Sequence, residues 1–407
     1  MKEESRSGGG PPKDGGGPGA GPPIGGKRVV RTRWRRPLPP ESESASASAI
    51  SAPPPEACAP STGAVGRILD PDRVAALVAC DSSISSYDPR SWAFVLRPDG
   101  RNAAAVAWPL GLLVFWGMAW TAALGSARAG PTRDAVADAL DGLVSPLLVP
   151  VSFLLVFRLG RAAVRFWDAR AAVGRVVEKS RVLMSTAAAG MAGAGWGGNN
   201  VPGDGGGGIL DDMGRWTCAF PIAVKNYLRP VPAEGGLKRR LEIGPLLTEA
   251  EAEEVLRTDS DAHIGPIAVL DRLRRLVWEG CHGSRDPDRL HAALYLRLSE
   301  HLDSLTGAWG ACERINGTPL PKVYVMHLRT FLVLYLIMYQ IEAAATHGWS
   351  ATPATVATCW GLLGIEAAAV ECERPFRCQS NHLPLGKVCI VTARNVAQTL
   401  RGAGRDG

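Results

Sequence analysis

The sequence predicts an all-α membrane protein with four transmembrane helices, a helical domain on the soluble side and a disordered N-terminus. Four stretches are apolar enough to form membrane helices, and amphipathic helical patterns fill most of the sequence between the second and the third. Glycine (47 of 407 residues) and proline (31) exceed their usual share, but both concentrate outside these stretches. Because 46% of all residues are hydrophobic, the rest of the chain is apolar enough for a large core.

The N-terminal residues 1–66 have the composition of a disordered segment. Gly-Pro runs, a Ser/Ala alternation and three consecutive prolines offer too little apolar surface to offset the entropy of ordering the chain. A basic cluster from Lys27 to Arg36 fits either a contact with anionic lipid or a solvated charge run, and we favour the second. A transit peptide would be atypical, because Glu3 and Glu4 stand near the start.

The first two membrane helices differ in length and in charge. Residues 103–124 carry no charge, and as a helix they would extend ~33 Å, which is enough to cross a bilayer core. The second apolar run, 143–157, continues into basic sequence without a turn signal, so we predict one helix over 143–165, bent by Pro150. The basic excess that follows places the soluble-side domain in the cytoplasm or, in a plastid, in the stroma.

The rest of the chain completes this arrangement. The glycine-rich residues 188–208 are expected to form a loop, and they lack the Gly-Lys-Ser/Thr of a phosphate-binding loop. The expected boundaries are 166–320 for the soluble-side helical region, 328–345 and 349–370 for the third and fourth membrane helices, 67–395 for the whole folded domain and 396–407 for a flexible C-terminal tail.

Composition and motifs exclude several classes of function. A net charge of +6 is too small to predict a nucleic-acid partner. The cysteines form no CxxC pair, so neither a disulfide framework nor a zinc site is expected. The sequence contains no GxSxG or HExxH motif, and His327 beside Arg329 is interpreted as a structural polar contact. We therefore expect no enzyme, no metal and no cofactor.

Four stretches resemble the bestrophin family of anion channels, in matching order and spacing. They are FRLGRAAVRFWDAR (157–170), RWTCAFPIAVKNYLR (215–229), TPLPKVYVMHLRTFLVLYL (318–336) and GLLGIEAAAVECERPFRCQSNHLPL (361–385). Upstream, YDPRSW (87–92) is similar to the segment that leads into the family's domain. The resemblance is to bacterial, plant and algal-type members. It implies a homopentamer around one central pore that conducts chloride and, in some branches, bicarbonate.

The resemblance aligns Val149, Phe153 and Phe157 with positions that line a narrow hydrophobic neck. On a helix these residues share one face, at i, i+4 and i+8. Rings of them would form an apolar constriction that can gate by dewetting. Periodicity alone would favour packing against other helices, so the neck interpretation depends on the resemblance.

Arg158, Arg161 and Arg165 follow at the predicted exit of the neck. In a pentamer they would form rings of positive charge that concentrate anions. The alternative is a basic flank whose arginines pair, for example Arg165 with Asp168. Arg161 departs from the small or polar residue usual in the family, and we expect it to face the ion path. A second constriction is placed by the resemblance at Ala293 or Leu294.

The remaining expectations concern a Ca²⁺ site, the function and the membrane that holds the protein. Animal members clasp Ca²⁺ with acidic residues after a PFG motif, but the equivalent residues 377–382 hold no carboxylate, so no Ca²⁺ site is expected. The protein is expected to be a passive anion channel in contact with lipid. A non-conducting membrane scaffold with the same fold is the alternative. The plasma membrane and the plastid thylakoid membrane are both open as locations.

Overall fold

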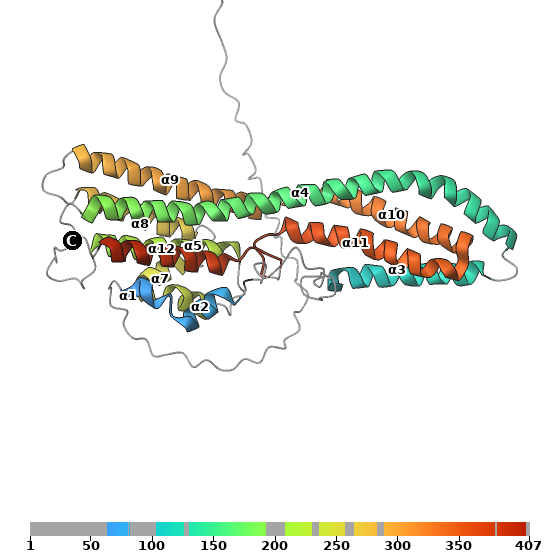
Figure 1. Ribbon diagram of the computed structural model, residues 1–407, viewed down its shortest axis with the longest axis horizontal. Helices are drawn as coiled ribbons and strands as arrows, with labels where there is room; N and C mark the ends of the chain where they lie inside the picture. Colours follow the sequence, from blue (N-terminus) through green and yellow to red (C-terminus); the bar gives the residue numbers. More distant parts are fainter. Residues whose placement is uncertain are drawn as a thin grey trace, which may run out of the picture. The chain divides into compact units, whose positions relative to one another are not determined.

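A computed structural model of the chain describes residues 63–79, 81, 103–125, 130–192, 208–229, 236–256, 264–282, 289–378 and 381–403. Residues 56–407 form one compact unit, and residues 1–55, a separate unit, lie outside the described part. Every regular element within the described ranges is helical, which confirms the predicted fold class (Figure 1). The basic cluster at 27–36 and the YDPRSW segment also lie outside the described residues.

The helices form two groups, which we call the membrane half and the soluble half. The membrane half consists of α3 (Ala103–Leu124), the first part of α4 (Gly130–Ala192) up to Arg165, α10 (Lys322–His347), the 3-10 helix η5 (Gly348–Ala351) and α11 (Thr352–Glu373). The soluble half consists of the rest of α4 together with α1 (Gly63–Arg67), α2 (Pro71–Val78), α5 (Ile209–Leu228), α6 (Gly236–Ile243), α7 (Glu249–Leu256), α8 (Gly265–His282), α9 (Arg289–Gly317) and α12 (Leu385–Ala403).

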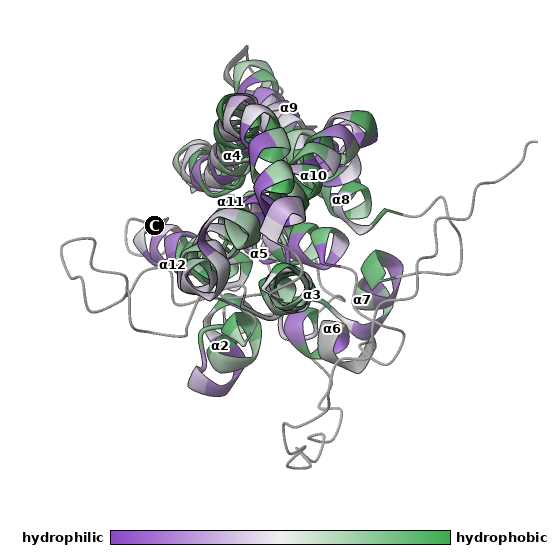
Figure 2. Ribbon diagram, turned by 90° about the vertical axis from the view of Figure 1, so that its right-hand side faces the viewer, coloured by the Kyte–Doolittle hydropathy of each residue, from purple (hydrophilic) through white to green (hydrophobic). Residues whose placement is uncertain are grey.

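Each half has its own hydrophobic core, and α4 contributes to both. In the membrane half, Leu155 of α4 packs with Leu336 of α10 and Cys359 of α11. In the soluble half, Leu183 of α4 packs with Trp216 of α5 and with residues of α8, α9 and α12. The residues of α3 are hydrophobic on all sides of the helix, whereas α2 and α7 carry hydrophobic and hydrophilic residues on different sides (Figure 2). The soluble-half helices are therefore amphipathic, as the sequence predicts.

Three segments are long and apolar enough to cross a membrane. They are Ala105–Leu124, Gly130–Met191 and Lys322–Glu373, the last of which includes both α10 and α11. Only 17–28% of the residues in their most apolar windows are buried within the chain, so large apolar side chains are left on the outside. Lipid solvates such surfaces in an integral membrane protein. The number of four separate spans stays a prediction.

The second membrane helix is longer than predicted at both ends. It begins at Gly130 rather than at 143, because its aspartates lie on one exposed face while Val136, Ala137 and Leu140 pack inward. The aspartates are Asp134, Asp138 and Asp141. It continues to Ala192, so the expected loop cannot begin at 188. Its N-terminal part contains Pro146 as well as Pro150, and it curves (Figure 1).

Both ends of the predicted folded domain are also wrong. The sequence predicts a disordered segment up to residue 66, but α1 begins at Gly63, and Val65 is buried in the soluble core. The flexible tail was expected from 396, but α12 extends to Ala403. Leu400 of α12 packs over Gly214 of α5, so an apolar face holds this end in place.

Candidate functional site

Three bulky apolar residues of α4 lie on the outside of the membrane half. Val149 is 73% exposed, Phe153 62% and Phe157 50%. The two phenyl rings are adjacent, with their centroids 4.5 Å apart. Val151 and Leu155 occupy the opposite side of the helix and are buried. Packing against the described helices of the same chain therefore does not explain the exposed stripe.

The exposed stripe continues past Phe157 with small and basic residues. A side chain at Gly160 would meet open space, and Val164 is 53% exposed. Arg161 is exposed and has no hydrogen bond or ion pair with the described residues. Arg161 is thus the first charged side chain on this face after the aromatic pair, and its place on the ion path stays a prediction.

Arg158 does not lie on this face, which corrects its expected place at the exit of the neck. Its side chain is fully buried and forms ion pairs with two residues of α11. Nε lies 3.3 Å from an oxygen of Glu366, and Nη2 lies 2.7 Å from an oxygen of Glu373. Arg329 of α10 binds the second oxygen of Glu366 at 2.8 Å. The four charges form one network, in which Arg158 is buried, the two carboxylates are largely buried and Arg329 is half exposed.

Arg165 is likewise a packing residue, and the expected ring of charge is wrong for it too. Its Nε donates to the backbone carbonyl of Glu373 at 2.9 Å, and Nη2 donates to the carbonyl of Ile315. Asp168, the alternative partner, is exposed, and no ion pair joins it to Arg165 in the described part of the chain. Of the three candidate arginines, only Arg161 is free to meet an ion.

The two candidates for a second constriction have different surroundings. Leu294 of α9 packs directly against Gly190 of α4, where an added Cβ would lie 2.6 Å from its methyl groups. Ala293 is exposed, as is Leu296, at 67%. Only Ala293 of the two candidates therefore presents its side chain on an open face of the soluble half.

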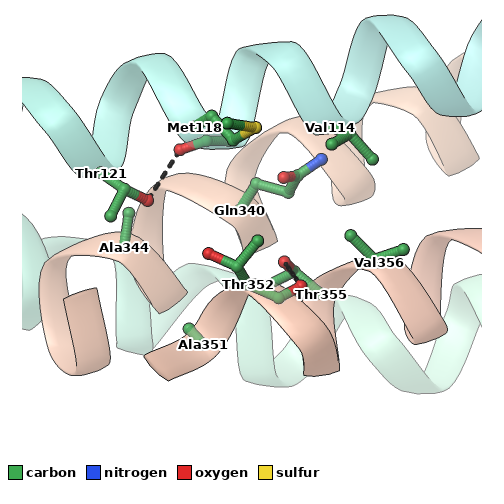
Figure 3. A pocket seen from close by; sticks show the side chains of 10 residues that line it. Val114, Met118, Thr121, Gln340, Ala344, Ala351, Thr352, Thr355 and Val356 are labelled. Carbon is green, nitrogen blue, oxygen red and sulfur yellow. Dashed lines mark hydrogen bonds between the residues drawn. The ribbon is translucent and has the colours of Figure 1, made fainter. Parts of the chain in front are cut away.

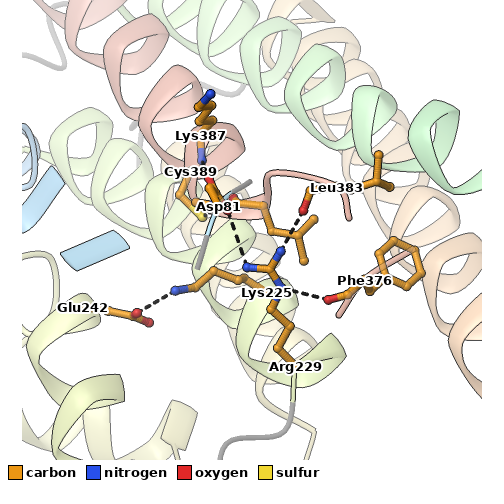
Figure 4. A network of polar contacts seen from close by, with 10 residues as sticks. Asp81, Lys225, Arg229, Glu242, Phe376, Leu383, Lys387 and Cys389 are labelled. Atoms are coloured by element: carbon orange, nitrogen blue, oxygen red, sulfur yellow. Dashed lines mark hydrogen bonds and ion pairs between the residues drawn. The ribbon is translucent and has the colours of Figure 1, made fainter. Parts of the chain in front are cut away.

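The corner between α11 and α12 is held by contacts that the sequence analysis missed (Figure 4). Arg229, at the end of α5, donates to the carbonyls of Phe376 at 2.8 Å and Leu383 at 2.7 Å. The buried carboxylate of Asp81 accepts the backbone N–H groups of Gly386 at 3.0 Å and Lys387 at 2.6 Å, which caps α12. The available signal for Arg229 was its place at the end of a largely apolar helical stretch, where a cation needs partners.

His382 lies inside this corner and is 1% exposed. Its Nε2 is 3.1 Å from an oxygen of Glu371. Burial lowers the pKa of His382 to about 4; a hydrogen bond with the backbone of Arg377 opposes this shift, and the charges of Arg377 and Arg229 add to it. Cys378 in the same corner is disulfide-bonded, which the cysteine spacing did not predict.

A small pocket lies between α3, α10 and the start of α11 (Figure 3). It is lined by Val114, Met118 and three threonines, and Gln340 of α10 closes one side. Gln340 is 3% exposed and donates to the backbone carbonyl of Leu113 at 2.6 Å. No charged residue is among those that line the pocket, and the hydrogen bond of Gln340 joins α10 to α3 beside it.

Comparisons with known proteins agree with this arrangement of helices. A family model described as bacterial/fungal bestrophin protein matches residues 90–398, so the chain belongs to the bestrophin family. A voltage-dependent anion channel-forming protein of Nostoc sp. is 26% identical over 64% of this chain and 78% of its own length. A voltage-dependent chloride channel 2, chloroplastic, of Arabidopsis thaliana is 24% identical over 62% of this chain and 54% of its own.

Solved structures share the fold. A bacterial bestrophin homolog from Klebsiella pneumoniae, which carries a point mutation, superposes with a TM-score of 0.57 at 19% sequence identity. That superposition covers 72% of this chain and 98% of the Klebsiella chain. At this level of identity the likeness shows the fold alone. The family and the relatives are channels rather than enzymes.

Proposed function

We propose that this chain is the subunit of a passive anion channel whose neck is formed by the exposed stripe of α4. The observation that carries the proposal is the order of residues on that stripe. Val149, Phe153 and Phe157 are exposed in succession, and Arg161 follows one turn later on the same side. A narrow apolar ring that opens onto a ring of cations is suited to conducting anions and to closing by dewetting.

The aromatic residues favour an anion over a cation in such a neck. The edge of a phenyl ring carries partial positive charge, so an anion that passes ring edges is stabilised relative to a cation. Arg161 would then raise the local concentration of anions where the neck opens. Chloride is the proposed ion, with bicarbonate as a second, and a homopentamer is the proposed assembly.

Recordings from purified protein in planar bilayers test the proposal. We expect anion-selective currents under chloride and bicarbonate gradients, and we expect Phe153→Ala to raise the open probability by weakening the apolar barrier. Phe115→Ala is the matched control, because Phe115 lies on α3 and is 72% exposed. The absence of currents with correctly assembled protein would favour the non-conducting scaffold. Equal effects of Phe153→Ala and Phe115→Ala would mean that α4 does not form the neck.

Arg161→Gln tests the electrostatic part separately. Removal of the charge ring should lower the chloride-to-sodium permeability ratio by about twofold or more and leave gating unchanged. Arg175→Gln is the control, since Arg175 is also a basic residue of α4 but lies about 20 Å further along the helix. An unchanged reversal potential for Arg161→Gln would reject the role of this residue.

We also propose that the channel opens without Ca²⁺. Residues 374–384 contain no carboxylate, and Ca²⁺ needs several oxygen ligands, usually including carboxylates. Arg229 and the cap by Asp81 hold this corner through hydrogen bonds of the chain itself. Currents should therefore be the same with millimolar Ca²⁺ and with a chelator, and stimulation by Ca²⁺ would contradict the proposal.

A further inference from the structure

Phe157 and Arg158 are consecutive residues with opposite environments. Successive side chains on an α-helix point about 100° apart. Phe157 is 50% exposed on the stripe, whereas Arg158 is completely buried. The boundary between the proposed neck and the interior of the membrane half therefore falls between these two positions. Any rotation of α4 about its axis must move both side chains together.

Arg158 is fixed at more than one point on α11. Glu366 and Glu373 are seven residues apart, which is about two helical turns, and one guanidinium binds both. Their side chains are only 10% and 12% exposed. In such surroundings a charge that loses its partner is strongly destabilised. The two ion pairs accordingly resist rotation and sliding of α4 against α11.

The carboxylates are in turn held by other parts of the membrane half. The second oxygen of Glu366 accepts from Arg329 of α10, and the second oxygen of Glu373 accepts the backbone N–H of Leu320 at 3.1 Å. Arg165 binds the backbone carbonyl of the same Glu373. The two glutamates that bind Arg158 are thus also held by α4, by α10 and by the residue Leu320 before α10.

We infer that Arg158 is the positioning residue of the neck: its ion pairs with Glu366 and Glu373 hold Phe157 and Phe153 toward the ion path. The inference rests on the proposed function, because it assumes that the stripe lines the pore. It assigns the buried charge network to gating. When a carboxylate is neutralised, α4 can rotate more freely about its axis. Phe153 and Phe157 are then no longer held toward the ion path, and the barrier that they form closes less well.

A double-mutant cycle in planar bilayers tests this inference through open probability. Glu373→Gln and Glu366→Gln each remove one ion pair and keep the shape of the side chain. Each should raise the open probability by about fivefold or more. The rise should be largely absent when Phe157→Ala is already present, because both substitutions act on one barrier. Arg158→Lys keeps the charge but loses the planar fork, so it should give a smaller shift in the same direction.

Glu242→Gln is the matched control for a purely structural effect. It breaks a buried ion pair of the soluble half, in which Lys225 Nζ lies 2.6 Å from Glu242, and it should be additive with Phe157→Ala. Additive behaviour of Glu373→Gln and Glu366→Gln, or equal coupling for Glu242→Gln, would overturn the role of Arg158. If Phe157→Ala alone changes nothing, the neck on α4 is wrong and the inference fails with it. If one Gln variant does not fold, the other and Arg158→Lys still decide.

Discussion

The membrane half and the soluble half leave different kinds of side chain on the outside. In the soluble half the largest buried residues are apolar, such as Trp216 and Phe220 of α5, and amphipathic helices turn their polar sides outward. In the membrane half Phe115 and Trp108 lie on the outside, while Arg158 is completely buried with two carboxylates. The difference in the exposed surfaces follows the local solvent, because lipid accepts apolar side chains. Buried charges have partners in both halves: Arg158 with Glu366 and Glu373, and Lys225 with Glu242.

The largest expected effect is on the buried charge of the membrane half. Arg158→Met leaves Glu366 and Glu373 without their common partner, which should cost about 3–5 kcal/mol of stability. The thermal unfolding midpoint in detergent, followed by size-exclusion chromatography, measures it. Arg161→Met removes an equal charge from the exposed face and should leave the midpoint nearly unchanged. Equal midpoints for the two variants would mean that the charge network adds no stability.

The counterpart in the soluble half is apolar. Trp216 is 2% exposed in the core between α4, α5 and α12, and Trp216→Ala should cost about 3–5 kcal/mol by leaving a cavity. The same thermal assay measures this change. Trp278→Ala, at a 52% exposed tryptophan of the soluble half, provides the control and should have a much smaller effect. A small effect at Trp216 would show that the soluble core can close over a large cavity.

The packing of α3 gives a third expected effect. A Cβ at Gly117 would lie 1.8 Å from the amide oxygen of Gln340, so Gly117→Ala must push the two helices apart or move Gln340 from the carbonyl of Leu113. We expect a loss of about 1–3 kcal/mol. Gly111→Ala lies on the same helix and meets nothing within 4 Å, so it should be neutral. A neutral Gly117→Ala would mean that α3 is only loosely attached to α10.

The stability of the corner between α11 and α12, which holds His382, should respond to pH. The folded state lowers the pKa of His382 to about 4 and so holds it neutral. The resulting stability is present above the ordinary pKa of about 6.5 and is lost as the pH falls towards 4, by about 1–3 kcal/mol in total. His382→Asn should flatten the decline of the unfolding midpoint between about pH 6.5 and 4.5. An equally steep decline in the variant would assign the acid sensitivity to other groups.

Much of the fold follows from the sequence, because a long apolar run without charge has few stable structures other than a membrane or core helix. The helix over 103–124 and the shared face of Val149, Phe153 and Phe157 depend only on composition and helical periodicity. Where charge interrupts the pattern, prediction fails. The three aspartates of the first turns of α4 resemble a loop in the sequence, but on a helix they form one exposed face.

The candidate site shows the same limit more sharply. Arg158 and Arg161 are three residues apart in one basic flank, and nothing local separates them. Their difference comes from Glu366 and Glu373, more than 200 residues later, which bind one arginine and not the other. A carboxylate within the apolar sequence of α11 was the available signal, because a charge there needs a partner inside the protein. The end of α12 also had a signal, in the i, i+4 spacing of Val396 and Leu400.

The smallest expected effect is at the outer surface of the membrane half, and it separates lipid from water as the solvent of that surface. Phe115 is 72% exposed near the middle of α3, so Phe115→Ala removes little packing and should change stability by less than about 0.5 kcal/mol. Phe115→Lys, in contrast, should impair membrane insertion, because a lysine at the centre of a membrane helix costs about 2.5–3.5 kcal/mol. The unfolding midpoint measures the effect of Phe115→Ala, and the fraction of protein inserted in vesicles measures that of Phe115→Lys. Normal insertion of the lysine variant would place Phe115 against water or a second subunit. The outer surface of the membrane half would then not be distinguished from that of the soluble half by contact with lipid.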